Sequence, residues 1–280
     1  MSLFISLSFA SQGDHVQMGA TALKIGNEHY LAISLENSKL WHTYWKNPGD
    51  AGLEPKFKFE VDQKELTLKD LPWPTPKRYI EQGSMWAYGY SGQYAFFYKL
   101  DNKLKNKTLN IVGTWLVCKD ICIPGTKTLD LVISNNLTGK SGTTLSDDQI
   151  IQIHSKLPKA SKADNLSVFL TKGQKENQLA IHFILENVEM DLIKKNSNII
   201  TPYLSPPFDF KHEETYYDSG SKTLFGRFYV DWDGIYEDPI WNLPENGIFK
   251  SPMKIKFLLN YPKTTPSKIL THEFAEFTLS

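Results

Sequence analysis

Residues 109–133 read LNIVGTWLVCKDICIPGTKTLDLVI, and this stretch indicates the kind of fold. Apolar side chains recur at every second position up to the residue before Cys118, and they do so again over residues 129–133. A period of two is typical of β-strands that bury one face. Pro124 and Gly125 lie between the two runs and favour a break in the pattern. The stretch therefore predicts one strand that leads into a cysteine turn and a second strand that leaves it.

Cys118 and Cys122 are the two cysteines of the chain and lie four positions apart. In one extended strand their Cα atoms would be roughly 13 Å apart, whereas a disulfide needs them within about 7 Å. An oxidised pair therefore requires a turn between them and closes a small ring that contributes only about 2 kcal/mol. A chain of 280 residues does not depend on so weak a staple. We interpret the pair as a redox centre; a structural disulfide or two free thiols are the alternatives.

Further alternating runs extend the β pattern over much of the chain. They include residues 31–35, 95–98, 179–185 and 253–259. Short strands at regular spacing, without strands and helices in alternation, favour β-sandwiches over a parallel sheet. We therefore expect an all-β fold of two β-sandwich domains with one short linking helix.

The linking helix is expected directly after residues 134–145, which are polar and rich in Gly, Ser and Thr, as linkers are. Ser146 followed by Gln149 is a capping-box pattern, and Pro158 stops the helix. His154 lies on the apolar face of this helix, so we expect it to pack against a neighbour rather than bind a ligand.

The composition excludes several classes of function. Apolar residues make up 41% and charged residues 22% of the chain, as in soluble globular proteins. The formal net charge is zero and no basic block is present, which argues against nucleic acid or an anionic membrane surface as the main partner. No stretch approaches the roughly 20 apolar residues that span a bilayer. The seven histidines show no metal-ligand spacing with the cysteines, so we expect no metal and no other cofactor.

The amino terminus has two interpretations. Residues 3–10 (LFISLSFA) are an apolar run that ends in a small residue. Such a run is typical of the tail of a secretory signal, although a basic segment before it is missing; it also fits a first buried strand. We expect residues 1–12 to be a signal remnant or a disordered terminus. Two close cysteines fit an oxidising compartment such as a periplasm.

Four aromatic or cysteine-containing segments follow one another in a specific order: YWKNPGDAGL at 44–53, WPTPKR at 73–78, YGY at 88–90 and WLVCKDICIP at 115–124. Taken singly, the first three are interpreted as a core strand with a turn and as rigid or aromatic loops. Together they resemble the amino-terminal periplasmic region of DsbD-type disulfide reductases, and in particular the ScsB-like branch. The resemblance covers roughly residues 30–135.

The resemblance implies an immunoglobulin-like sandwich whose catalytic pair is Cys118 and Cys122. It further implies that Cys122 forms the mixed disulfide with a partner. The family's aromatic cap and docking loop, which covers the disulfide, maps onto Trp86, Ala87, Tyr88 and Gly89. This chain departs from well-known DsbD sequences in two ways, because its cysteines are closer together and Ala87 replaces an aromatic residue of the cap.

The resemblance also implies a function, whereas the polar stretch at 134–145 and the length of the chain predict the domain division. Residues 13–140 would be the DsbD-like redox sandwich and residues 146–280 a second immunoglobulin-like sandwich. The protein would be a thiol:disulfide oxidoreductase component in the periplasm of a bacterial envelope. It would take electrons from a thioredoxin-like redox domain or a DsbD-like membrane protein and pass them to disulfide-bonded substrate proteins. The rivals are a non-catalytic binding module with a structural disulfide and a copper-related periplasmic chaperone.

Overall fold

The computed structural model describes most of the chain. The described residues are 15–81, 83, 85–142, 145–161, 165–174, 178–191, 200–203, 209–231, 248–249, 253–260, 266–274 and 277–278. Residues 1–12, where a signal remnant or disordered terminus is expected, lie outside these ranges.

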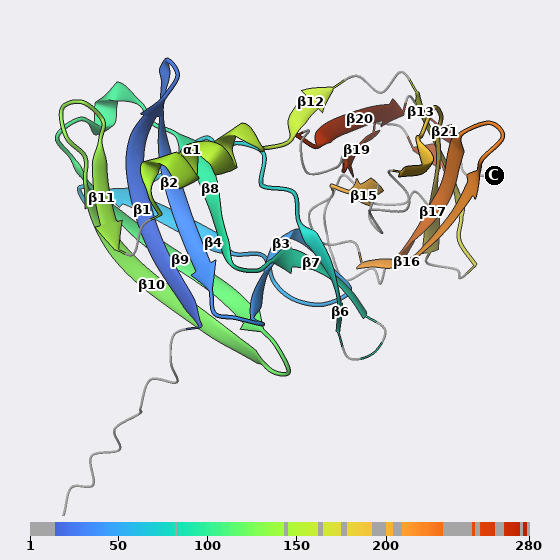
Figure 1. Cartoon of the computed structure of the whole chain (residues 1–280), viewed down its shortest axis with the longest axis horizontal. Helices are drawn as coiled ribbons and strands as arrows, with labels where there is room; N and C mark the ends of the chain where they lie inside the picture. The colour runs from blue at the N-terminus through green and yellow to red at the C-terminus, as the bar shows by residue number, and fades with distance from the viewer. Residues whose placement is uncertain are drawn as a thin grey trace, which may run out of the picture.

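Two antiparallel sheets form the amino-terminal sandwich (Figure 1). The first has the order β11 (Gly139–Gly142), β1 (Val16–Ile25), β2 (Glu28–Asn37) and β8 (Gln93–Lys99). The second has the order β5 (Lys64–Leu66), β4 (Lys56–Val61), β9 (Thr108–Cys118), β3 (His42–Gly49), β7 (Met85–Tyr90) and β6 (Lys77–Glu81). In the second sheet β10 (Cys122–Val132) also pairs with β9. A short helix, η1 (Asn102–Leu104), precedes β9, and α1 (Asp147–Ser155) follows β11.

The core of this sandwich follows from the alternation seen in the sequence. Leu31, Ile33 and Leu35 of β2 point between the sheets and meet Leu109 and Ile111 of β9. All five side chains are fully buried. The predicted strand–turn–strand arrangement is confirmed, because β9 and β10 form one antiparallel hairpin on either side of the cysteine turn.

Helix α1 covers the outer face of the first sheet (Figure 1). The predicted capping box is present: the Gln149 N–H donates to Ser146 Oγ, and the Ser146 N–H donates to Gln149 Oε1. Ile150 is fully buried between the helix and the sheet. His154 packs against the Tyr30 ring, and burial lowers its pKa. Its expected packing role is confirmed.

The carboxy-terminal half is again built of strands. One sheet has the order β12 (Lys159–Ser161), β20 (Lys268–Phe274), β19 (Met253–Leu259) and β15 (Ile200–Pro202). A second has the order β13 (Leu166–Lys172), β14 (Gln178–Leu185), β17 (Thr223–Asp231) and β16 (Asp209–Asp218). A small pair joins β18 (Ile248–Phe249) to β21 (Phe277–Thr278). The all-β fold class is therefore confirmed in both halves.

The expected linker at residues 134–145 is not a free connection. Gly139–Gly142 form β11, which pairs antiparallel with β1 at the edge of the first sheet. The polar composition wrongly suggested a linker. The side chains of an edge strand face solvent and can be polar, while its backbone still completes the sheet. The chain therefore leaves the first sandwich after β11 rather than before it.

The two halves share hydrophobic contacts. Leu258 and Ile269 belong to the same buried cluster as the core of the amino-terminal sandwich. The Tyr203 ring meets the Trp45 ring edge-on at a centroid distance of 5.1 Å. The Trp73 N–H donates to the Tyr203 hydroxyl at 3.4 Å. The second half therefore packs against β3 through the Trp45 side chain.

These contacts predict how the chain tolerates truncation. A chain that ends at Asn135 lacks β11, α1 and the Leu258–Ile269 contact, whereas a chain that ends at Pro158 keeps the first two. We expect the longer fragment to melt at a clearly higher temperature, because burial of Ile150 and similar side chains contributes about 2–5 kcal/mol each. Thermal unfolding followed by circular dichroism measures this. Equal melting temperatures would show that β11 and α1 add nothing to this sandwich.

Candidate functional site

The cysteines form a disulfide that closes the β9–β10 hairpin. Cys118 is the last residue of β9, Cys122 is the first residue of β10, and the two are direct cross-strand partners. Their Cα atoms are 4.1 Å apart, as in a pair of antiparallel residues that are not hydrogen-bonded to each other. The three-residue turn between them closes with a bond from the Lys119 N–H to the Ile121 carbonyl. The small ring expected from the spacing is confirmed.

The two sulfur-bearing residues differ in accessibility. Cys118 is 1% exposed, because it lies between β10 on one side and β3 on the other. Cys122 is an exposed residue at the tip of the hairpin. Ile121, next to it in the turn, is also exposed, at 61%. A thiol in solution can therefore approach Cys122, whereas Cys118 is shielded.

A chain of polar side chains leads inward from Cys122. The Tyr44 hydroxyl lies 3.7 Å from Cys122 Sγ. It donates to both carboxylate oxygens of Glu81, at 3.0 and 3.1 Å. His42 Nε2 donates to Glu81 Oε1 at 2.7 Å. Tyr44 and His42 come from β3, whereas Glu81 ends β6, so the sheet order brings these residues together across β7.

Burial and hydrogen bonds set the protonation of this group. Burial raises the pKa of Glu81, but hydrogen bonds from His42 and Tyr44 outweigh it and hold the pKa below its ordinary value. The carboxylate therefore stays ionised at neutral pH, although its side chain is only 12% exposed. Burial raises the pKa of the Tyr44 phenol, and the charge of Glu81 raises it further. Tyr44 therefore remains a neutral donor beside the disulfide.

Apolar groups cover the buried sulfur. Tyr44, Ala87 and Cys118 form one buried cluster, and Tyr79 and Leu116 pack against it. The Tyr79 ring also stacks on His42 at a centroid distance of 4.3 Å. The β6–β7 hairpin, which carries Tyr79 and Ala87, therefore lies over Cys118.

The four residues assigned to the cap have different surroundings. They lie in strand β7, where a loop was expected. Ala87 is in the cluster around Cys118, whereas Tyr88 is 3% exposed and belongs to the main core. The Trp86 ring lies 4.0 Å under the Arg78 guanidinium. A Cβ on Gly89 would lie 1.9 Å from the Thr43 carbonyl oxygen, so only glycine allows β7 to pair this closely with β3.

Sequence reasoning did not assign Tyr44, Glu81, His42 or Tyr79 to the site. Tyr44 and His42 stand within the WHTYW run and were interpreted as part of a core strand. Glu81 shows no local pattern at all, because its partners are 37 and 39 residues away. The pairing of this buried carboxylate with a histidine becomes visible only when the order of the strands is known.

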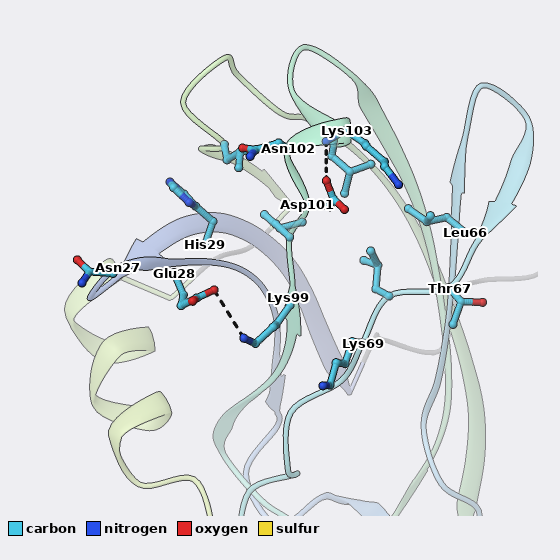
Figure 2. Close-up of a pocket in the computed structure, with 14 residues that line it drawn as sticks. Asn27, Glu28, His29, Leu66, Thr67, Lys69, Lys99, Asp101, Asn102 and Lys103 are labelled. Atoms are coloured by element: carbon cyan, nitrogen blue, oxygen red, sulfur yellow. Dashed lines mark hydrogen bonds and ion pairs between the residues drawn. The ribbon is translucent and has the colours of Figure 1, made fainter.

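One pocket of the described residues lies away from the disulfide. It has a volume of about 740 Å³ and is bordered by the β1–β2 turn, the segment after β5, and η1. Figure 2 shows its polar rim, where Lys99 pairs with Glu28 and the Lys103 N–H donates to Asp101. Because η1 precedes the first residue of β9 and Cys118 is its last, the two sites are separated by about 30 Å of strand. This pocket therefore contributes nothing to the disulfide site.

Two further features of the described ranges bear on metals and membranes. Within them, no three side chains of His, Cys, Asp and Glu gather as metal ligands would. No helix among the described residues is long and apolar enough to cross a membrane.

The ionised state of Glu81 predicts a pH-dependent stability. Because its pKa is lowered in the fold, its contribution is complete above the unfolded pKa and is lost as the pH falls through the folded pKa. We expect Glu81→Gln to lower the free energy of unfolding by about 1–3 kcal/mol at pH 7 and by much less at pH 3. Urea unfolding at the two pH values measures this. Glu28→Gln, which alters an exposed pair, is the control; an equal loss at both pH values would contradict the assignment.

Comparison with known proteins agrees with this geometry. Residues 14–134 match the family model described as the amino-terminal part of thiol:disulfide interchange protein DsbD. The fold is similar to the crystal structure of the N-terminal periplasmic domain of ScsB from Proteus mirabilis, with a TM-score of 0.63 and 19% sequence identity. The match covers 95% of this chain and 96% of that one. No curated protein matches the chain. Residues 14–134 therefore match the DsbD amino-terminal domain family, and the fold of the chain is that of a ScsB periplasmic domain.

Proposed function

We propose that this protein carries out thiol–disulfide exchange in a bacterial periplasm through Cys118 and Cys122. It receives electrons from a thioredoxin-like domain, either free or part of a DsbD-like membrane protein, and passes them to disulfide-bonded substrate proteins. The match of residues 14–134 to the DsbD family model and the likeness to a periplasmic ScsB domain support the compartment and the type of partner. The observation that carries the proposal is a disulfide with one exposed and one buried cysteine.

The asymmetry of the disulfide fixes the order of bond changes. A thiolate of the donor attacks Cys122 Sγ, because Cys118 is shielded by β3 and β10. A bond forms between the donor sulfur and Cys122 while the bond to Cys118 breaks, and Cys118 leaves as a thiolate that takes up a proton. The donor's second thiolate then displaces Cys122 and leaves as a disulfide. Two electrons and two protons have moved to the pair, and the reverse sequence reduces a substrate.

The Tyr44–Glu81 pair is positioned to influence the protonation of Cys122 during exchange. The phenol is neutral and lies 3.7 Å from Cys122 Sγ. It can donate a hydrogen bond to the Cys122 thiolate when that thiolate leaves, or accept one from the thiol. Glu81 holds the phenol in place and supplies an ionised acceptor one hydrogen bond further in. Because the pKa of Glu81 is lowered, the carboxylate stays ionised, and its role is to orient the Tyr44 hydroxyl beside Cys122.

The β6–β7 hairpin is the cap in this proposal. Ala87 faces the buried sulfur together with Tyr79, while Trp86 presents a half-buried ring for a docking partner. Tyr88 and Gly89 anchor the strand, one in the core and one against β3. This cover closes the Cys118 side of the disulfide, so that an incoming thiol is restricted to attack at Cys122.

Single cysteine variants test the direction of attack. Cys118→Ser leaves an exposed thiol at Cys122, and Cys122→Ser leaves a buried thiol at Cys118. We expect the thiolate of the first variant to attack the disulfide of an oxidised thioredoxin-like domain and form a mixed disulfide, with release of one thiol of that domain, and the second variant to form little or none. Non-reducing electrophoresis and mass spectrometry of the adducts measure the difference.

The control is reduction of the native disulfide by the same thioredoxin-like domain. If the bridge resists reduction until the fold melts, it is a structural staple, and the protein is a binding module. Equal trapping by both variants would overturn the assignment of Cys122 as the attacked cysteine.

Shielding by the cap gives a separate prediction. Tyr79→Ala should speed reduction of the native disulfide by glutathione severalfold, because it opens the cover over Cys118. Ile80→Ala is the matched control, since Ile80 is the next residue of β6, points to the opposite face and is 67% exposed. The rates of disulfide reduction are measured by quenching samples at set times and alkylating the free thiols. Equal rates in the two variants would show that β6 does not shield the disulfide.

A further inference from the structure

A second pocket lies directly beside the disulfide hairpin. It has a volume of about 550 Å³ and lies between the β3–β4 connection and the β9–β10 hairpin. Apolar groups dominate its walls, and they come from Pro48, Leu53, Leu116 and Pro124. Leu53 is 66% exposed at the rim. No part of the exchange chemistry described above uses this pocket.

The strand register places the pocket on the same face as the disulfide. Leu116 and Pro124 are cross-strand partners, two positions before Cys118 and two after Cys122. Side chains two positions apart in a strand point to the same face and are separated by about 6.6 Å. The pocket wall formed by Leu116 and Pro124 is therefore the direct continuation of the surface that carries the reacting sulfur.

The wall formed by the β3–β4 connection is held in place by the site itself. Gly52 passes over the Tyr44 ring with φ of +98°, and a Cβ there would lie 2.1 Å from the ring. Asp50 ties the same connection to β7, since its N–H donates to the Trp86 carbonyl at 2.7 Å and its carboxylate accepts from the Trp86 N–H at 2.9 Å. The pocket is thus built before any partner arrives, and it keeps its position relative to Tyr44.

We infer that this pocket binds an apolar side chain adjacent to the reactive cysteine of the partner protein, and so selects partners whose cysteine has apolar neighbours. The inference rests on the proposed exchange at Cys122. A mixed disulfide brings the partner's Cα within about 7 Å of the Cys122 Cα, and the partner's next residue lies 3.8 Å further along its chain. That residue therefore reaches the level of Pro124 and Leu116. Burial of a leucine-sized group among these apolar walls favours the encounter.

Edge addition of a partner strand is the less favoured mode of docking. In the described part of the chain β10 pairs with β9 alone, so its other edge carries no strand pairing. Pro124 lies on that edge and has no N–H to donate. The partner chain is therefore directed over the face of the hairpin, where the pocket lies.

Short cysteine peptides test the inference on the whole protein. The probes are Ac-Gly-Xaa-Cys-Xaa-Gly-amide, in which Xaa is Leu, Asn or Gly; Asn matches Leu in size but is polar. Each peptide thiolate attacks Cys122 and displaces Cys118, and a second peptide thiolate then releases Cys122 and leaves as peptide disulfide. We expect the Leu peptide to reduce the native disulfide about tenfold faster than the Asn peptide at equal thiolate concentration, as burial of a leucine side chain allows.

Two variants then locate the preference. Leu53→Asn makes the rim polar, and Thr126→Trp fills the pocket from an exposed position of β10. Both should reduce the Leu-to-Asn rate ratio to near one. Val132→Asn is the control, because Val132 is 67% exposed at the far end of the same strand, and it should keep the ratio.

The outcomes separate this inference from the proposed function. If all three peptides reduce the native protein at equal rates, exchange stands and the pocket has no role in selection. A ratio that survives both Leu53→Asn and Thr126→Trp overturns the inference as well. If neither the peptides nor dithiothreitol reduce the native disulfide, the exchange function fails and the inference fails with it.

Discussion

The pairing of β9 with three other strands is the constraint on which the site depends. β10 follows β9 along its whole length, while β4 pairs with its first part and β3 with its last two residues. This arrangement buries Cys118 in the middle of a sheet and leaves Cys122 at the tip of a hairpin. The proposed attack at Cys122 therefore follows from the order of the strands, which buries Cys118. The three residues of the turn only keep Cys122 accessible.

Glu81 connects this hairpin to the rest of the sheet. A carboxylate that is 12% exposed is stable in the ionised form only because two donors satisfy it. Both donors are on β3, whereas Glu81 is on β6, so the ionised carboxylate ties β6 to β3 across β7. The same interaction that orients Tyr44 toward Cys122 thus also keeps the cover closed. Chemistry and shielding are coupled through one side chain.

The sequence predicts those parts of the structure that depend on neighbours along the chain. The β9–β10 hairpin follows from alternation around Cys118 and Cys122, and the start of α1 follows from Ser146 and Gln149. Residues 85–90 were expected to be a loop, because their strand partners in β3 and β6 are set by the fold of the whole sheet. Glu81 was missed for the same reason. Local pattern identifies the cysteine pair, whereas long-range pairing decides what surrounds it.

The position of Pro124 also affects how copies of the protein behave toward one another. An unpaired strand edge is a template on which further strands of any chain can assemble into larger aggregates. β10 is long enough to act as such a template, and it must stay uncovered near Cys122 if partners are to reach the sulfur. A proline at an outward-facing backbone position interrupts the row of donors without disturbing the ladder to β9. The missing donor therefore makes strand addition less favourable at the end of the hairpin that carries the disulfide.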